Sequence, residues 1–256
     1  MNDADQPVNV LKTGSFRKTD GEYTLNLLSV QNIDQILALQ EAVIAVLPEQ
    51  EQNFVLKKDR AFFENHFAVG NAVIGILHEG QLIAQSVIVN PTAAHPKTGM
   101  TDMALKAKPK KITVLQGVIV HPDYRGNSLI SVMIDTWLET ARKEKRPHAL
   151  AEVSLENHHS WSAFLKGGLN IHSIGTDPAD GSVLYNVHAV VGAGARQRLK
   201  DAFVKKAGRN VICAAEDVEM QKYLLAKGYK GVTFDACQGQ IEFHPAKLQL
   251  KRPRLG

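Results

Sequence analysis

The sequence predicts an α/β fold in which a central sheet is flanked by helices. Residues 112–120 form an apolar run rich in β-branched side chains, as expected of a strand that is buried on both faces. Residues 128–142 then place apolar side chains at helical spacing. Residues 148–155 and 157–166 follow as a second strand and a short helix. This alternation of strands and helices indicates the fold class.

The loop between the first strand and the first helix has the features of an anion site. It has the sequence Val-His-Pro-Asp-Tyr-Arg-Gly-Asn-Ser-Leu over residues 120–129. A strand that ends abruptly before a helix leaves several backbone N–H groups unpaired and pointing in one direction. The positive end of the helix dipole lies behind these groups, and Arg125 adds a fork of donors. We therefore expect the loop to bind an anion.

Two motifs carry a resemblance to a known family. The first is Val-x-Pro-x-Tyr-Arg-Gly over residues 120–126, and the second is Asn-x-x-Ser-x-x-x-Phe-x-x-x-Gly over residues 157–168. Together, in this order and separated by one helix and one strand, they resemble the two core motifs of the GNAT family of N-acetyltransferases. The resemblance covers residues 22–191. The alternative is an ordinary strand–helix–strand–helix unit that binds no ligand.

The resemblance implies the acyl-CoA N-acyltransferase fold, with a mixed, mostly antiparallel central sheet. It implies acetyl-CoA as cosubstrate, no metal, and transfer of the acetyl group to a primary amine of a small molecule or a protein. A non-catalytic acyl-CoA-binding or regulatory domain of the same fold is the alternative. In the family the first motif holds the pyrophosphate and the second lies along the pantetheine and thiol. The residues expected to contact the cofactor are Val118, Ile119, Val120, Arg125, Gly126, Asn127, Ser128, Leu129, Ile130, Asn157, Ser160 and Phe164.

Three positions depart from the family pattern. Relatives usually carry small residues where Ser128 and Ile130 stand, because these let the backbone approach phosphate closely. Ser128 is small and can add a hydroxyl donor, whereas the bulk of Ile130 predicts a slightly different position for the pyrophosphate. Relatives often use a tyrosine to protonate the thiolate where this chain has Phe164, which cannot donate.

The candidate catalytic residues follow from what acetyl transfer requires. A backbone N–H of the strand before the loop faces the thioester carbonyl in the family, and Val118 is our choice. Relatives often carry a glutamate base on that strand; this chain has Gln116, which can orient an amine but cannot take a proton. Glu152 lies in an apolar strand that would raise its pKa, which suits a base. A structural pairing of Glu152 with a lysine or arginine is the alternative.

The acid that would protonate the thiolate is less clearly indicated. Tyr185 and Tyr124 are the candidate substitutes for the missing tyrosine. Histidines 121, 158 and 159 titrate in the appropriate range, although solvated histidines are common at the start of a helix. Positioning contributes much of the rate, and water can relay protons, so the function does not depend on such a group.

We predict four segments along the chain. Residues 1–21 are polar without periodicity and are expected to be disordered or extended. Residues 22–191 form the GNAT domain, residues 192–246 an α/β extension, and residues 247–256 a basic tail. Within the domain, helices at 33–47 and 58–69 are expected to wall the acceptor site, and hairpins are expected at 71–89 and 170–191. The loop at 90–111 either covers the acceptor pocket or is a surface insertion.

The extension resembles an incomplete second half of the acetyltransferase. A helix is expected at 195–206, a strand at 211–215, a helix at 218–227 and a possible hairpin at 231–243. Residues 216–229 have the spacing of residues 156–169, although chance is the alternative. Gly192-Ala193-Gly194-Ala195 could form a second anion loop, but no arginine precedes it, and Asp217 stands where Asn157 stands in the first copy. We therefore expect one cofactor per chain, at residues 125–130, and a second half that serves as a packing partner.

Composition bounds the remaining possibilities. The chain has 256 residues, of which 44% are hydrophobic and 22% charged, with a formal net charge of +4. The basic clusters at 106–111 and 247–254 contain no interleaved aromatic residues, so a solvated loop and a tail are favoured over a nucleic-acid partner. Two cysteines give no disulfide framework, and no signal peptide or membrane-length apolar run is apparent. We expect a cytoplasmic protein without a membrane partner, and leave a homodimer open.

Overall fold

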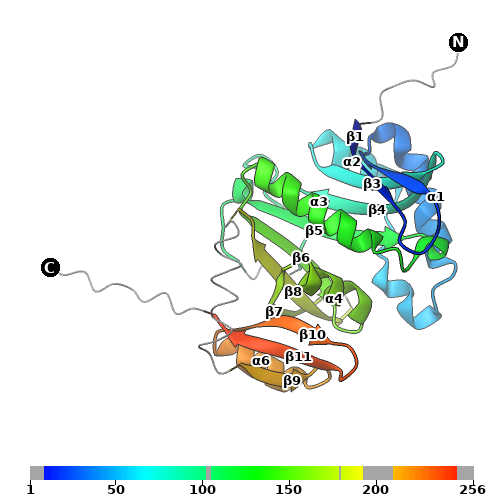
Figure 1. The fold of residues 1–256 in the computed structure, drawn as a ribbon. Coiled ribbons are helices and arrows are strands. Elements are labelled where there is room, and N and C mark those ends of the chain that lie inside the picture. Colours follow the sequence, from blue (N-terminus) through cyan, green and yellow to red (C-terminus); the bar gives the residue numbers. More distant parts are fainter. Residues whose placement is uncertain (1–8, 102–104, 179, 193–209, 247–256) are drawn as a thin grey trace, which may run out of the picture.

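The computed structural model describes residues 9–101, 105–178, 180–192 and 210–246. These residues form one 11-stranded sheet in the order β1-β2-β3-β4-β5-β6-β8-β7-β10-β11-β9 (Figure 1). The strands are β1 (Asn9–Ser15), β2 (Glu22–Leu27), β3 (Ala72–His78), β4 (Gln81–Val89), β5 (Ile112–Val120), β6 (His148–Ser154), β7 (Asn170–Thr176), β8 (Val183–Val190), β9 (Val211–Ala214), β10 (Tyr229–Asp235) and β11 (Gln240–Pro245). The helices are α1 (Ile33–Ile44), α2 (Arg60–Ala68), α3 (Leu129–Lys143), α4 (His158–Lys166) and α6 (Val218–Ala226).

Helices cover both faces of the sheet. On one face α1 and α2 pack against β3 and β4, in a cluster that includes Ile36, Phe63 and Val87. On the other face α3 and α4 pack against a larger cluster centred on Trp137 and Trp161. The stripe predicted on α3 supplies Leu129, Met133 and Trp137 to this cluster, and Ala141 is also buried. The indole Nε1 of Trp137 donates to Thr113 Oγ1 at 2.9 Å. The buried stripe explains why this segment forms a helix here.

The sheet is mixed and mostly antiparallel, which confirms the predicted fold class. The paired strands run antiparallel except for β5 and β6, which run parallel because α3 connects them. Their pairing extends from Ile112 opposite His148 to Leu115 opposite Ala151 and then stops. On the other side of β5 the register with β4 shifts at Gln116, which therefore sits in a β-bulge. The bulge and the divergence of the two strands occur at the same place.

Part of the N-terminal segment forms a strand. Residues 9–15 are β1, which pairs with β2 as a hairpin, so this part is extended, one of the two predicted states. Residues 1–8 and the basic tail at 247–256 lie outside the described residues. In the loop at 90–111, Met100, Leu105 and Ala107 pack against a small core cluster under β5 and β6.

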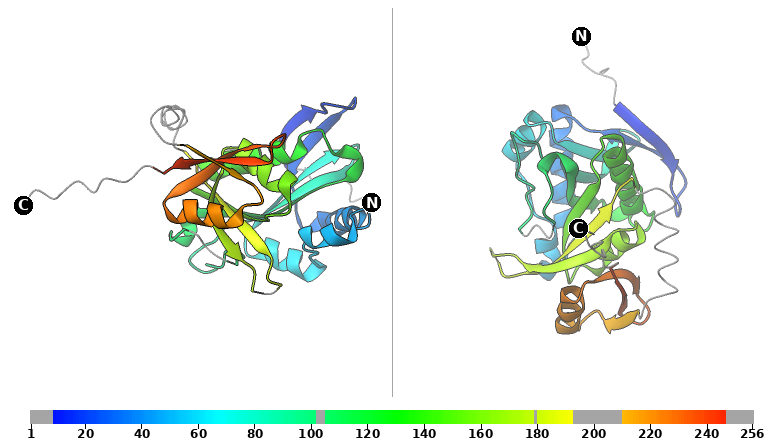
Figure 2. Two further views of the ribbon diagram at one scale, coloured as in Figure 1. Left: turned by 90° about the horizontal axis from the view of Figure 1, so that it is seen from below. Right: turned by 90° about the vertical axis from the view of Figure 1, so that its left-hand side faces the viewer.

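The C-terminal strands continue the same sheet past β7 (Figure 2). β10 pairs antiparallel with β7 through Gly231 and Ile171, β11 pairs with β10, and β9 pairs with β11. The helix expected at 195–206 and most of the second glycine loop fall outside the described part of the chain. The C-terminal segment is thus attached at the edge of the sheet, on the far side from β1.

Candidate active site

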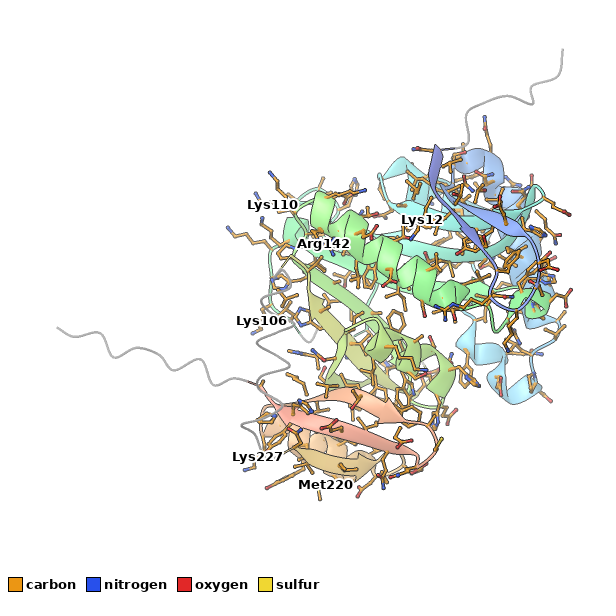
Figure 3. All side chains as sticks on the ribbon, in the orientation of Figure 1. Lys12, Lys106, Lys110, Arg142, Met220 and Lys227 are labelled. Atoms are coloured by element: carbon orange, nitrogen blue, oxygen red, sulfur yellow. The ribbon has the colours of Figure 1, made fainter. Side chains whose placement is uncertain are left out.

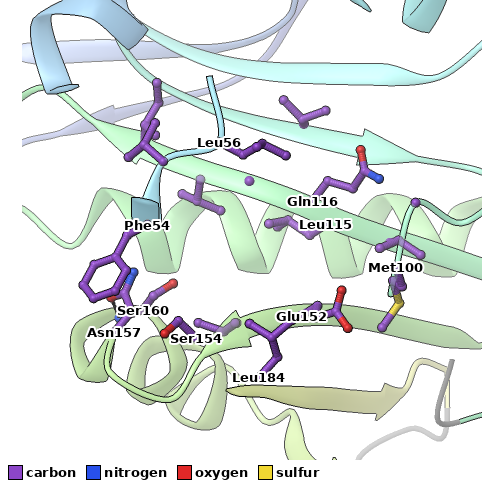
Figure 4. A pocket seen from close by; sticks show the side chains of 18 of the residues that line it. Phe54, Leu56, Met100, Leu115, Gln116, Glu152, Ser154, Asn157, Ser160 and Leu184 are labelled. Atoms are coloured by element: carbon purple, nitrogen blue, oxygen red, sulfur yellow. Dashed lines mark hydrogen bonds between the residues drawn. The ribbon is translucent and has the colours of Figure 1, made fainter. Parts of the chain in front are cut away.

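A cavity of about 300 Å³ opens where β5 and β6 diverge (Figure 4). Its walls come from β5, β6, α4, the segment at 54–58, the loop at 99–101 and the β7–β8 hairpin. Gly117 of β5 has open space where a Cβ would project. Beyond Leu115 and Ala151 the two strands no longer pair, so backbone groups of β5 that would have bonded to β6 are open to the cavity.

Most of the residues predicted on β5, β6 and α4 meet in this cavity. The lining residues include Gln116, Val118, Ile119, Glu152, Asn157, Ser160 and Phe164. Figure 4 shows Gln116 and Glu152 near Met100 at one end, and Asn157, Ser160 and Phe54 at the other. The cavity therefore has a polar end with a carboxylate and an opposite end at the start of α4.

The end that contains Glu152 is closed by the loop at 98–101. The backbone N–H of Thr101 donates to Glu152 Oε2 at 2.9 Å, and Gln116 Nε2 donates to the carbonyl of Thr98 at 3.2 Å. Gly99 adopts a φ of +71°, and a Cβ there would overlap the Gln116 amide. The loop thus covers this end of the pocket, which was one of its two predicted roles.

Asn157 is a helix cap as well as a lining residue. Its side-chain oxygen accepts from the backbone N–H of Ser160 at 3.1 Å, which satisfies one of the free donors at the start of α4. Phe164, on the next turns of the same helix, is 2% exposed and packs into the core as it lines the cavity. The second motif therefore builds the α4 wall of the site.

Sequence reasoning missed the polar residues on the α1–α2 side. Lys58 lines the cavity, and burial lowers the pKa of its ammonium group. Its backbone N–H donates to Gln40 Oε1 at 3.2 Å, and Gln40 Nε2 donates to the Lys58 carbonyl at 2.9 Å. Gln85, which is 3% exposed, lines the cavity from β4. No motif marks these residues, because their position depends on how α1 and β4 pack.

The predicted pyrophosphate loop lies outside this cavity, at the start of α3. Gly126 has a φ of +82°, and Ser128 adopts the left-handed conformation with a φ of +61°. Serine disfavours this conformation by about 1 kcal/mol or more, whereas glycine adopts it freely. Ser128 thus adopts a backbone conformation typical of glycine at a position where the family pattern has a small residue, with the free N–H groups of α3 behind it.

The candidate acids do not reach the cavity. Tyr185 is 1% exposed, and its hydroxyl donates to Gln221 Oε1 at 2.6 Å, so the expected catalytic role of Tyr185 is not supported. Burial raises its pKa further from neutrality. The ring of Tyr124 packs against Phe16, and the ring of His158 packs against Trp161. Neither of these lines the cavity.

Two further observations concern other site classes. In the described part of the chain, no group of three or more His, Cys, Asp or Glu side chains is arranged to hold a metal ion. Among the helices of the described residues, none has the length and apolar character needed to cross a membrane.

Comparison with known proteins agrees with the geometry. Three solved structures superpose with TM-scores of 0.51: an N-acetyltransferase from Staphylococcus aureus Mu50, the GNAT domain of S. lividans PAT, and the ribosomal-protein-S18-alanine N-acetyltransferase from Escherichia coli. They are 12%, 17% and 11% identical, cover 66%, 69% and 68% of this chain, and are themselves covered to 98%, 96% and 96%. At such identities they show a shared fold. No curated protein sequence matches the chain.

A family model gives a more direct assignment. The model described as the Acetyltransferase (GNAT) family matches residues 39–168, a segment that contains both motifs and the strands β5 and β6, between which the cavity opens. The chain therefore belongs to the GNAT acetyltransferase family, in which acetyl-CoA is the cosubstrate.

Proposed function

We propose that this chain is an acetyl-CoA-dependent N-acetyltransferase that acts on a primary amine of a small molecule or a protein. The observation that carries the proposal is the cavity between β5 and β6, where Glu152 lies near the bulged Gln116 beside unpaired backbone. Acyl transfer to an amine needs a carbonyl-polarising donor and a proton acceptor close together. The cytoplasmic location expected from the sequence stays a prediction.

The residues present fit the cosubstrate. The pyrophosphate would lie at residues 125–130, where left-handed Ser128 and the start of α3 direct N–H groups outward. The pantetheine arm would pass Val118, Ile119 and Val120 on one side and Asn157, Ser160 and Phe164 on the other. When bound, acetyl-CoA supplies the activated acetyl thioester.

The roles of the side chains follow from their chemistry. Glu152 would accept the proton of the amine, held in place by the N–H of Thr101. Gln116 would orient the amine with its amide, whose Oε1 is buried and has no hydrogen-bond partner among the described residues. A backbone N–H at Val118 would polarise the carbonyl. With Tyr185 outside the cavity, we propose that water protonates the leaving thiolate.

The cofactor site is tested by calorimetric titration with CoA. Arg125→Glu should weaken binding by about 2–4 kcal/mol, because a charge-assisted contact is lost and repulsion is added. Arg142→Glu is the matched control, since it makes the same charge change at the exposed far end of α3 (Figure 3). Equal CoA affinity of the two variants would show that the loop does not hold the cofactor.

The base is tested by kinetics. Glu152→Gln should lower kcat by roughly 100-fold with little change in melting temperature. Glu156→Gln, at an exposed position on the same strand–helix connection, should leave kcat unchanged. A changed melting temperature with unchanged kcat for Glu152→Gln would assign this residue a structural role.

The alternative is a non-catalytic acyl-CoA-binding domain. The observation in its favour is that Phe164, which cannot donate a proton, occupies the cavity wall where relatives often carry the acid. Release of CoA in the presence of a panel of primary amines separates the two functions. Tight CoA binding without release for any amine would favour the binding domain.

We propose further that residues 192–246 are a degenerate second half without a cofactor. The support is that β9, α6, β10 and β11 follow the order of β6, α4, β7 and β8 and pair in the same arrangement. Titration should therefore give one equivalent of CoA per chain, and two equivalents would contradict this assignment.

A further inference from the structure

The tip of the β1–β2 hairpin, residues 16–21, lies on the loop that precedes α3 (Figure 1). The side-chain Oδ1 of Asn127 accepts from the backbone N–H groups of Arg17 and Lys18, at 3.1 and 2.8 Å. Asn127 is 4% exposed, so these bonds are shielded from water. This hairpin precedes residue 39, where the match to the family model begins.

Aromatic packing fixes the tip a second time. The ring of Phe16 lies 5.5 Å from that of Tyr124 and 5.0 Å from that of His78, centroid to centroid. The hydrogen bonds to Asn127 use backbone N–H groups, and the aromatic packing uses the Phe16 ring. Neither of these two anchors uses the charged ends of Arg17 and Lys18. The cationic groups are therefore placed at the loop without being needed to hold the hairpin there.

The two cationic side chains converge on the predicted pyrophosphate loop. Arg17 Nη1 donates to Ser128 Oγ at 3.2 Å. Lys18 Nζ lies 2.8 Å from the position that a Cβ on Gly126 would occupy, so its side chain runs across that glycine. With Arg125, this brings three cations to the start of α3. In the part of the chain that the structure describes, Arg17 and Lys18 form no ion pair.

Three cations beside the positive end of a helix repel one another unless an anion lies between them. An arginine fork and a lysine point charge are the two side chains that proteins use to hold phosphate oxygens. Two carboxylates are nearby in the sequence. Asp123 lies 3.8 Å from the imidazole of His121 and is exposed, and Asp20, exposed in the hairpin tip, forms no ion pair among the described residues. The arrangement is suited to an added phosphate group rather than to an internal salt bridge.

We propose that Arg17 and Lys18 bind the phosphates of CoA, so that the β1–β2 hairpin completes the cofactor site from outside the matched family segment. This inference rests on the proposed function. It also gives Ser128 a role that glycine could not fill, because its hydroxyl orients the Arg17 guanidinium toward the loop. The hairpin thereby supplies charge at a loop whose sequence departs from the family pattern.

The test compares wild type, the double variant Arg17→Gln/Lys18→Gln and the control Lys12→Gln by calorimetric titration with CoA. Lys12 is exposed on β1 of the same hairpin (Figure 3). We expect the double variant to bind CoA at least about tenfold more weakly, with a smaller dependence on salt, and the control to match wild type. The melting temperatures of the ligand-free proteins should agree, because the anchors are retained.

Dephospho-CoA, which lacks the 3′-phosphate, locates the contact. An equal loss for CoA and dephospho-CoA supports contact with the diphosphate, and a loss for CoA alone supports contact with the 3′-phosphate. Wild-type affinity and salt dependence in the double variant would overturn the inference and leave the proposed function intact. Absence of CoA binding by wild type itself would overturn both.

Discussion

The segments 148–190 and 211–245 have the same architecture but different surroundings. Each consists of a strand, a helix and a hairpin, and in each the last strand lies between the other two, as β6-β8-β7 and β9-β11-β10. The two segments are joined where β7 pairs with β10, through one pair of facing residues, Ile171 and Gly231. These two residues occupy matching positions in their segments, so the halves are related by an approximate two-fold axis at this contact.

The local backbone features match closely. Asn157 Oδ1 accepts from Ser160 N at 3.1 Å, and Asp217 Oδ1 accepts from Met220 N at 3.0 Å. Each helix is followed by a glycine in the left-handed region, with φ of 89° and 85°, and each following strand carries a register shift at the same place. Caps and turns are short-range requirements, so they are met in both halves.

The side chains that face the cavity in the first half have changed in the second. Glu152 corresponds to Ile212, which is 65% exposed on β9, the last strand of the described sheet. Ser160 and Phe164, which also line the cavity, correspond to Met220 and Leu224. Outside the cavity, Trp161 corresponds to Gln221; both donate to the carbonyl just after the preceding strand, at 2.9 and 2.8 Å. What the second half lacks is a diverging neighbour such as β5. A cofactor site of this kind thus depends on the strand beside the half, not on the half alone.

The contact at the two-fold axis gives the largest predicted effect. A Cβ on Gly231 would lie 2.9 Å from Ile171 Cδ1 and 3.2 Å from both Ile171 Cβ and Ile241 Cγ2. Gly231→Val should therefore lower the free energy of unfolding by about 3 kcal/mol, since overpacking strains a closed core. Chemical denaturation measures this. The control Ile212→Val, at an exposed position of β9, should change the free energy far less, and equal effects would show that the contact is not tight.

Lowering the pH should reduce the free energy of unfolding by about as much, through a buried histidine of the first half. Burial lowers the pKa of His188 to about 4, helped by His172, His148 and Lys230, whereas its counterpart His244 lies 2.9 Å from Glu242 Oε1. The unfolded chain binds a proton at the usual histidine pKa, so stability is lost as pH falls from about 6.5 to 4.

Between pH 7 and 4, the free energy of unfolding should fall by about 3 kcal/mol more for wild type than for His188→Gln. Burial alone would raise the pKa of Glu242, but hydrogen bonds from His244 and Thr233 outweigh it, and the pKa is lowered. The stability that this carboxylate contributes is therefore lost only as pH falls through its lowered pKa. Parallel pH profiles of the free energy of unfolding for wild type and His188→Gln would contradict the assignment.

A buried bond across the two halves is expected to contribute about 2 kcal/mol. Tyr185→Phe removes the donor to Gln221 Oε1 and leaves that oxygen buried without it. The melting temperature should fall while CoA affinity and kcat stay at wild-type values, because Tyr185 does not line the cavity. A fall in kcat without a change in stability would return Tyr185 to the catalytic candidates.

The smallest effects come from the matched caps. Asn157→Ala and Asp217→Ala should each cost about 1 kcal/mol of stability. Only Asn157→Ala should also weaken CoA binding, since Asn157 lines the cavity and Asp217 does not. Calorimetric titration of both variants decides this, and equal CoA affinities would mean that Asn157 acts only as a cap.

The sequence alone determined the features that depend on neighbouring residues. The order of strands and helices from 112 to 190 and the short helix that begins near Asn157 follow from apolar periodicity, turn chemistry and a motif. The anion loop at Arg125 follows from the same kind of local pattern and stays a prediction. The resemblance to the GNAT family, which the family model confirms, rested on the same short stretches.

Only the tertiary structure decided which distant groups meet. Lys58 and Gln40 reach the cavity from the α1–α2 side, and Thr101 reaches Glu152 from a loop. Arg17 reaches Ser128 from the β1–β2 hairpin, in a segment for which the sequence predicts only a disordered or extended chain. Tyr185 was predicted near the chemistry, but alternation along β8 turns it toward Gln221. Such contacts depend on sheet register and helix packing over long sequence separations, which no local pattern encodes.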